Sequence, residues 1–183
     1  LGLQSSMHPF ITCPTYRTEL ADLDLDTRVA RMREPEMRAT LIEEHALRTR
    51  GMSGMVAQSF HKMFPLGDPP DYEPAPEHSV AARAATAGIS PWEYCYDAML
   101  EMDGKQMLYT PFANYSEDNL DCCRDMILSE NTVMGLGDGG AHVGTICDAS
   151  YTTYLLAHWG KDRTRGELID VPTLIKAQSR DTA

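Results

Sequence analysis

The clearest signal in the sequence is the stretch Thr132-Val-Met-Gly-Leu-Gly-Asp-Gly-Gly-Ala-His-Val-Gly144. Its first part, Thr132 to Leu136, is a short apolar run bounded by turn residues and predicts a buried strand. The glycines that follow let the backbone turn sharply, because they carry no Cβ. Asp138 and His142 lie in this glycine-rich loop. An acid and an imidazole are therefore expected at the carboxyl end of a strand, where α/β proteins build their sites.

Helices are expected on both sides of this strand and loop. Ser116-Glu-Asp118 can cap a helix that continues to Leu128 and leads into the strand. After the loop, Asp148 and Ser150 can cap a helix from Tyr151 to Trp159. The order helix, strand, glycine-rich loop, helix is typical of the outer ring and inner strands of an α/β barrel.

The rest of the chain carries clear local signals. Ser90-Pro-Trp-Glu93 has the form of a capping box with proline at the first helical position, and predicts a helix to about Met102. Five prolines between Pro65 and Pro76 exclude regular structure there and predict an exposed, semi-rigid connector. Further predictions are helices over 25–32, 35–50 and 77–87, a turn at Asp103-Gly104, a weak strand over 105–110 and a last helix opened by Asp170-Val-Pro172.

The charge and the apolar content of the chain exclude some classes of binding partner. The chain of 183 residues has a net charge of −11 and a sequence pI near 4.9, so a nucleic-acid surface is not expected. Apolar runs stay far below the ~20 residues that a membrane helix needs, and we expect a cytoplasmic protein without a membrane partner. The five cysteines include adjacent Cys122 and Cys123 but no C-x-x-C pair. Buried or idle thiols in a reducing compartment are expected.

Two stretches carry a resemblance to a known family. Leu136 to Ser150, with His158 to Gly166 behind it, resembles the last barrel strand and following helix of the N-acyl-D-amino-acid deacylase (D-aminoacylase) branch of the metal-dependent amidohydrolases. Gly2 to Phe10 and Pro14 to Tyr16 are similar to the segment that precedes the mobile lid in such enzymes. The resemblance extends over nearly all of the chain and is most specific at the Asp138 loop.

The resemblance implies an α/β fold of a particular kind. The chain would be the later part of a (β/α)8 TIM barrel of amidohydrolase type, mostly helical and carrying a lid insertion. Residues 1–17 would be a barrel loop segment, 18–88 the helical lid, and 89–183 the last strand, the catalytic loop and the flanking helices. Such a chain would belong to a longer enzyme and would be inactive by itself. A second copy of the chain, in a homo-oligomer, can cover the exposed half-barrel surface.

The resemblance assigns catalysis to Asp138. In this family the aspartate after the last strand contacts the metal-bound water, takes its proton as a base and returns it as an acid to the departing amine. A bound divalent cation lowers the pKa of its water toward ~7, so a nearby carboxylate can collect the proton. Asp138 is also a possible metal ligand. Spacing alone leaves a second interpretation, a turn-forming residue, because Asp-Gly pairs are common in turns.

Substrate binding is expected from the same loop. His142 can orient the substrate or stabilise the developing oxyanion, or it can be a packed histidine. Gly139 and Gly140 allow a close approach of the substrate to the backbone. Some relatives carry an arginine shortly after the aspartate to bind the substrate carboxylate, whereas this chain has Ala141-His-Val143 there. Arg163 and Arg165 are possible substitutes, against the interpretation of a solvated surface run.

The metal site is incomplete in this chain. The resemblance implies one or two divalent ions, zinc above all, acting on a small N-acyl amino acid. The six histidines show no His-x-His pair and no other ligand spacing, so a complete set of ligands is not expected here. Other candidates for the mouth or wall of the site, each with a core or surface alternative, are His8, His61, Tyr16, Tyr72, Asn114 and Tyr115.

Two alternatives belong to other classes of function. Gly135-x-Gly137-x-x-Gly140 matches a dinucleotide-binding fingerprint, although no second strand ending in an acidic residue follows. A non-catalytic helical interaction module is the other alternative, with the methionine-rich helices as a partner surface. Methionine at helical spacing is more often part of a core.

Overall fold

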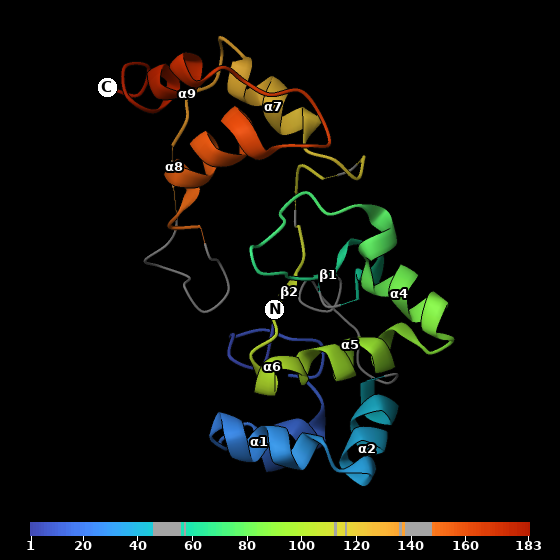
Figure 1. The fold of residues 1–183 in the computed structure, drawn as a ribbon. Helices are drawn as coiled ribbons and strands as arrows, with labels where there is room; N and C mark the ends of the chain where they lie inside the picture. The colour runs from blue at the N-terminus through green and yellow to red at the C-terminus, as the bar shows by residue number, and fades with distance from the viewer. Residues whose placement is uncertain (46–55, 57, 112, 116, 136, 138–147) are drawn as a thin grey trace. The chain divides into compact units, whose positions relative to one another are not determined.

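The computed structural model describes residues 1–45, 56, 58–111, 113–115, 117–135, 137 and 148–183. They form two compact units, Leu1–Phe112 and Ala113–Ala183, and each unit is described by itself. Helices predominate among the described residues, and the strands found there form one short antiparallel pair (Figure 1). The expectation of an α/β chain that is mostly helical is confirmed.

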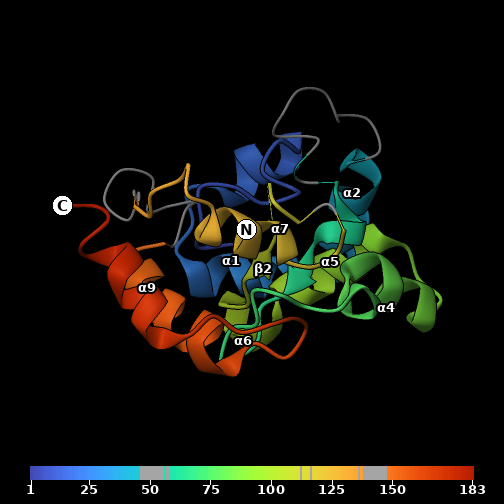
Figure 2. The ribbon, with the colours of Figure 1, turned by 90° about the horizontal axis from the view of Figure 1, so that it is seen from above.

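The first unit consists of short helices and one pair of two-residue strands. Its helical elements are η1 (Tyr16–Leu20), α1 (Leu25–Met32), α2 (Pro35–His45), η2 (Phe60–Lys62), η3 (Pro76–His78), α4 (Val80–Ala87), α5 (Pro91–Met99) and α6 (Glu101–Gly104). The strands β1 (Phe64–Pro65) and β2 (Leu108–Tyr109) pair with Phe64 opposite Tyr109. Helices α4 and α5 pack together, and both views show them side by side (Figures 1 and 2).

Capping residues set the helix boundaries that the sequence predicts. At the start of α5, Glu93 N donates to Ser90 Oγ at 3.2 Å and Ser90 N donates to the Glu93 carboxylate at 2.9 Å, which completes the capping box. Asp24 accepts a hydrogen bond from Thr27 N at 3.0 Å and caps α1. Gly88 ends α4 in the left-handed conformation, with φ of 69°.

The chain turns after α5 at the predicted Asp103-Gly104 pair. Met102 and Asp103 have positive φ values of 51° and 54°, so the helix predicted to reach Met102 ends earlier, at Met99. Gly104 has φ of 78°, and a Cβ at this position would lie 2.3 Å from Val29 Cγ2. Glycine is therefore required here both for its backbone conformation and for the contact with α1.

Aromatic and sulfur-containing side chains build the core of the first unit. Phe10 packs edge to face against Trp92 and Tyr96, with ring centroids 5.8 and 5.1 Å apart. The buried Tyr96 hydroxyl donates to the backbone oxygen of Met32 at 2.8 Å, and burial raises the pKa of Tyr96 above its usual range. Four methionines are fully or almost fully buried in this unit, which confirms the core interpretation for them: Met32, Met37, Met63 and Met99.

The second unit contains α7 (Asp121–Leu128), α8 (Tyr151–Tyr154), η4 (Leu155–Asp162) and α9 (Val171–Gln178). α8 continues directly into η4, which has π-helical hydrogen bonding. This helix extends past Gly160, the residue predicted to end it. A Cβ on Gly160 would lie 3.2 Å from Val171 Cγ2 and 3.4 Å from Leu174 Cδ1, so the glycine allows α9 to pack closely on η4.

Two predictions for the second unit are wrong. Residues 132–135 of the expected last barrel strand form no strand, and Val133 is 74% exposed. A strand requires a neighbouring backbone for its hydrogen bonds, and among the described residues no strand lies beside this segment. Helix α7 begins at Asp121 and not after the Ser116–Asp118 cap, because Asp118 has φ of 56°, which a helix does not accommodate.

The remaining predictions concern the proline-rich stretch, the domain boundaries and membrane-spanning helices. The proline-rich stretch is irregular over 66–75, but the prediction for 65–76 is wrong at its two ends, because Pro65 lies in β1 and Pro76 begins η3. Glu73, which is 2% exposed, also departs from the exposed connector that the prolines predict. The division of the chain into a barrel loop segment, a lid and the last barrel part, with boundaries after residues 17 and 88, remains a prediction. Within the described parts of the chain, none of the helices combines the length and the apolar character that crossing a bilayer requires.

Candidate active site

The residues predicted to form the active site lie outside the described part of the chain. They are Asp138, His142, Gly139 and Gly140. The residues on both sides of this segment are described. A Cβ on Gly137 would lie 2.8 Å from the Tyr151 ring and 3.6 Å from the backbone oxygen of Asp148. Gly137 and Asp148 are therefore neighbours, and a side chain at position 137 would have to displace the Tyr151 ring.

The helix after the loop begins where the sequence predicts, but its cap differs. Ser150 occupies the N-cap position without a side-chain capping hydrogen bond, so its predicted capping role is wrong. The backbone fixes the first turn instead, because Tyr151 N donates to the Asp148 oxygen at 3.0 Å. One turn further on, the rings of Tyr154 and His158 stack with centroids 4.8 Å apart. The chain after Asp148 thus enters α8, which continues into η4.

Arg163, a candidate for binding the substrate carboxylate, is buried inside the second unit. Its side chain has 0% exposure and bonds to the Asp121 carboxylate at 2.6 Å. It also donates to the backbone oxygen of Glu167 at 3.1 Å, and its guanidinium lies 4.8 Å from the Trp159 ring centroid. A Cβ on Gly166 would come within 2.4 Å of the guanidinium. Arg163 therefore joins α7 to the segment after η4, and the solvated-surface interpretation is wrong for it.

The other candidate residues of the second unit are Arg165, Tyr115 and Asn114. Arg165 donates to the Tyr115 hydroxyl at 3.1 Å, and Tyr115 is buried. Asn114 is exposed and adopts φ of 61°, a conformation that asparagine tolerates better than most residues. Its backbone oxygen lies 3.1 Å from Cys122 Sγ. These contacts stabilise the turn before α7.

His8 is a core residue of the first unit. It is 1% exposed, its ring packs edge to face on Tyr16 with centroids 4.5 Å apart, and its Nδ1 accepts a hydrogen bond from Phe10 N at 3.3 Å. The proton of the neutral ring is thereby assigned to Nε2, which has no hydrogen-bond partner among the described residues. Burial, then the charges of Arg28 and the amino terminus, lower the pKa of His8 from 6.5 to about 3.

Arg28 holds the backbone around His8 and Tyr16. Its guanidinium donates to four backbone oxygens at 2.7 to 3.0 Å, which belong to Leu3, Leu20, Ala21 and Leu23. It also lies 5.9 Å from the Tyr16 ring centroid. The partners of Arg28 are backbone oxygens and the Tyr16 ring. His8, Tyr16 and Arg28 therefore form a packed polar cluster inside the first unit.

The other histidines are dispersed. His45 packs against Trp92 at a centroid distance of 3.8 Å, whereas His61 and His78 are exposed. Tyr72, a candidate for the substrate wall, packs instead on Tyr109 at 5.5 Å. Within the described ranges, no three His, Cys, Asp or Glu side chains come together as a possible metal site. These residues do not fit the zinc that the resemblance implies.

The four cysteines that the structure describes fall into two groups, and Cys147 lies outside the described residues. Cys13 and Cys95 are buried, and burial raises the pKa of Cys95 above its usual range. Cys122 is exposed and Cys123 is partly exposed, both at the start of α7. The prediction of buried thiols is thus confirmed for the first pair.

Comparisons with models of known protein families, with curated proteins and with solved structures find no match to this chain. The function must therefore be argued from the loop residues and the geometry at its two ends. Residues 132–135 form no strand, which counts against the dinucleotide alternative and against the predicted last barrel strand alike.

Proposed function

We propose that this chain is the later part of a metal-dependent amidohydrolase that hydrolyses N-acyl-D-amino acids or related small amides. Asp138 would be its general base and acid. The proposal rests on the resemblance of residues 136–150 to the catalytic loop of that family. The structural observation that supports it is the close packing of Gly137 against Tyr151 and Asp148.

This packing bears on Asp138 because Gly137 is its covalent neighbour. A general base contributes to catalysis only when it is held within hydrogen-bonding reach of the proton it removes. A glycine tightly packed beside a helix is a suitable anchor for such a carboxylate.

The proposed chemistry is proton transfer. Asp138 would take a proton from the attacking water and deliver it to the departing amine when the C–N bond breaks. Zinc, when bound in the intact enzyme, would supply a more acidic water and polarise the amide carbonyl. Its ligands are expected outside the described residues, which contain no suitable group.

The substrate carboxylate would be bound by the loop. Arg163 is not available, because its guanidinium is buried and bonded to Asp121. We therefore assign this contact to His142 and to the backbone N–H groups of Gly139 and Gly140, which can approach an anion closely. Helices α7 and α8–η4 would belong to the outer ring of the barrel.

An assay of the protein encoded by the complete gene tests this proposal. N-acetyl-D-leucine and N-acetyl-L-leucine are supplied at equal concentration, and release of the free amino acid is followed before and after removal of metal with a chelator. We expect release from the D substrate, loss of activity with the chelator and recovery with zinc. The absence of release from a panel of N-acyl amino acids, with zinc present, would contradict the proposal.

A further inference from the structure

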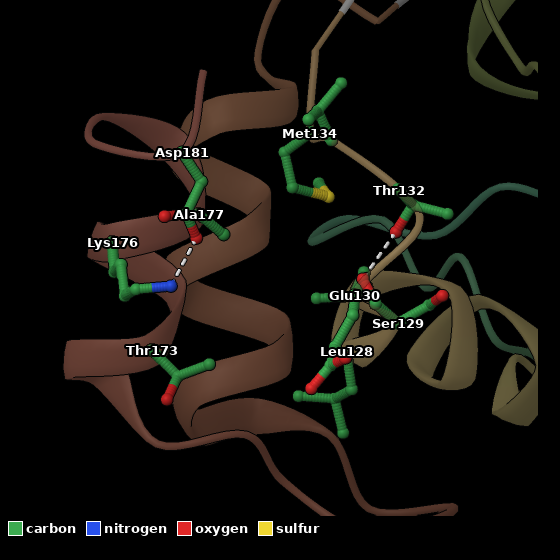
Figure 3. Close-up of a pocket in the computed structure, with 11 residues that line it drawn as sticks. Leu128, Ser129, Glu130, Thr132, Met134, Thr173, Lys176, Ala177 and Asp181 are labelled. Atoms are coloured by element: carbon green, nitrogen blue, oxygen red, sulfur yellow. Dashed lines mark hydrogen bonds and ion pairs between the residues drawn. The ribbon is translucent and has the colours of Figure 1, made fainter. Parts of the chain in front are cut away.

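The second unit contains a pocket of about 440 Å³ that none of the residues assigned to the active site lines (Figure 3). One wall is the end of α7 with residues 129–134, and the other is α9 with Asp181. The volume lies within the range typical of small-molecule sites, roughly 300–1,000 Å³. The pocket is therefore large enough for a small organic ligand.

Hydrogen bonds fix the first wall. The Ser129 hydroxyl accepts from Asn131 N at 3.2 Å, and the Thr132 hydroxyl donates to the Ser129 oxygen at 3.2 Å and to the oxygen of Met126. Such side-chain bonds to the backbone are typical of stable turns. Glu130 lies within this turn, so its backbone position is defined before any ligand binds.

The second wall is fixed by the packing of α9. The Asp170 carboxylate caps this helix by accepting from Thr173 N at 3.0 Å. Leu174 of α9 is fully buried, and Gln178 donates to the backbone oxygen of Thr152 at 3.0 Å. The pocket therefore lies between two elements that are each held independently.

Two ion pairs connect α7, which ends at the first wall, to the segment that precedes α9 in the second wall. Asp121 and Arg124, both on α7, bond to Arg163 at 2.6 Å and to Glu167 at 2.7 Å respectively. Arg163 and Glu167 belong to the segment between η4 and α9. These pairs limit how far the two walls can separate.

The lining combines apolar surface with an excess of negative charge. Leu128, Val133 and Met134 contribute apolar side chains, and Figure 3 shows Leu128 and Met134 beside the pocket. Lys176 is paired with Asp181 at 2.7 Å and is thereby neutralised. Glu130, the other charged residue of the lining, forms no ion pair within the described part of the chain.

We propose that this pocket binds a small organic ammonium ion with an apolar body. The ammonium group would bond to the Glu130 carboxylate, and the body would contact Leu128, Val133 and Met134. An anion is disfavoured because it would face the Glu130 carboxylate, while the lysine of the lining is already paired with Asp181. The net charge of −11 also favours cations over anions near the surface. This inference uses residues 129–134 in the irregular conformation that the structure gives them, and it does not depend on the role of Asp138.

Three probes of nearly equal shape test the inference: 2-phenylethylammonium, 2-phenylethanol and 3-phenylpropanoate. The 183-residue chain with ¹³C-labelled methionine methyl groups is titrated at pH 7, and the Met134 signal is identified from a Met134→Leu variant. We expect a saturating shift of the Met134 methyl group with the ammonium probe only. Equal affinity for all three probes, or shifts confined to other methionines, would overturn the inference.

Variants of Glu130 provide the charge test. Glu130→Gln keeps the shape of this exposed side chain and is expected to weaken binding of the ammonium probe about tenfold, the usual effect of one charged hydrogen bond. Glu130→Lys should reverse the preference and favour 3-phenylpropanoate. Asp125→Asn, an exposed change on α7 outside the pocket, is the matched control and should leave the affinity unchanged. Unchanged affinity in Glu130→Gln would refute the assignment.

Discussion

Replacement of Asp138 by asparagine is expected to lower kcat for an N-acyl-D-amino acid by about 10²- to 10⁴-fold, the usual contribution of a general acid or base. The amide has nearly the same shape as the carboxylate but cannot accept and return a proton. KM should change much less, because the proton is transferred in the transition state. The measurement is steady-state kinetics on the protein encoded by the complete gene.

The same variant separates catalysis from a turn-forming role for Asp138. Asparagine before glycine forms tight turns at least as well as aspartate, so a structural role would survive the substitution. We expect an unchanged thermal unfolding temperature together with the loss of kcat. Asp125→Asn, an exposed change on α7, is the control and should keep full activity. Near-normal kcat in Asp138→Asn would refute the catalytic assignment.

Acid is expected to destabilise the first unit through His8. The pKa of His8 is lowered from 6.5 to about 3 in the folded chain, mainly by burial. As the pH falls below 6.5, the unfolded chain binds a proton that the folded chain does not bind until about pH 3. The free energy of unfolding therefore has its full value above pH 6.5 and falls by about 1.4 kcal/mol per pH unit below it, for a total on the order of 5 kcal/mol.

The measurement is the free energy of unfolding by urea between pH 7 and pH 4. His8→Asn keeps an acceptor near the position of Nδ1 for the bond from Phe10 N and removes the titrating ring. This variant is expected to be less stable at pH 7 but to lose less stability on acidification. His78→Asn, at an exposed histidine, is the control. A pH dependence as steep in His8→Asn as in the original chain would contradict the role of His8.

Features that depend on a few adjacent residues were predictable from the sequence. The capping box of Ser90 and Glu93, the cap at Asp24 and the left-handed Gly88 each use hydrogen bonds within one helical turn. The irregular chain over 66–75 follows equally from its prolines. Local chemistry determined these boundaries, so the sequence was sufficient.

Features that depend on distant partners were not predictable. Residues 132–135 have the composition of a strand, but strand formation requires a neighbouring strand that the described residues do not provide. Arg163 lies in a charged run, yet Asp121, 42 residues earlier, and the Trp159 ring bury it. The nearby Trp159 and Gly166 were the available signals, and neither identifies the carboxylate partner.

The sequence identified the residues of the candidate site but not their contacts. Sequence reasoning singled out Asp138 and His142, while the contact of Gly137 with Tyr151 depends on how the helix after the loop packs. No sequence motif marks the pocket beside α9, because its two walls are distant in the chain, with Ser129 and Thr173 for example 44 residues apart. Sites of this kind become visible only when the elements are placed in space.

Zinc content is the most direct test of the central claim that these residues belong to a metal-dependent amidohydrolase whose ligands lie elsewhere. The 183-residue chain and the protein encoded by the complete gene are each dialysed against a weak chelator and analysed for metal. We predict no bound metal in the 183-residue chain and one or two zinc ions in the complete protein. Stoichiometric zinc in the 183-residue chain, or none in the complete protein, would contradict the account.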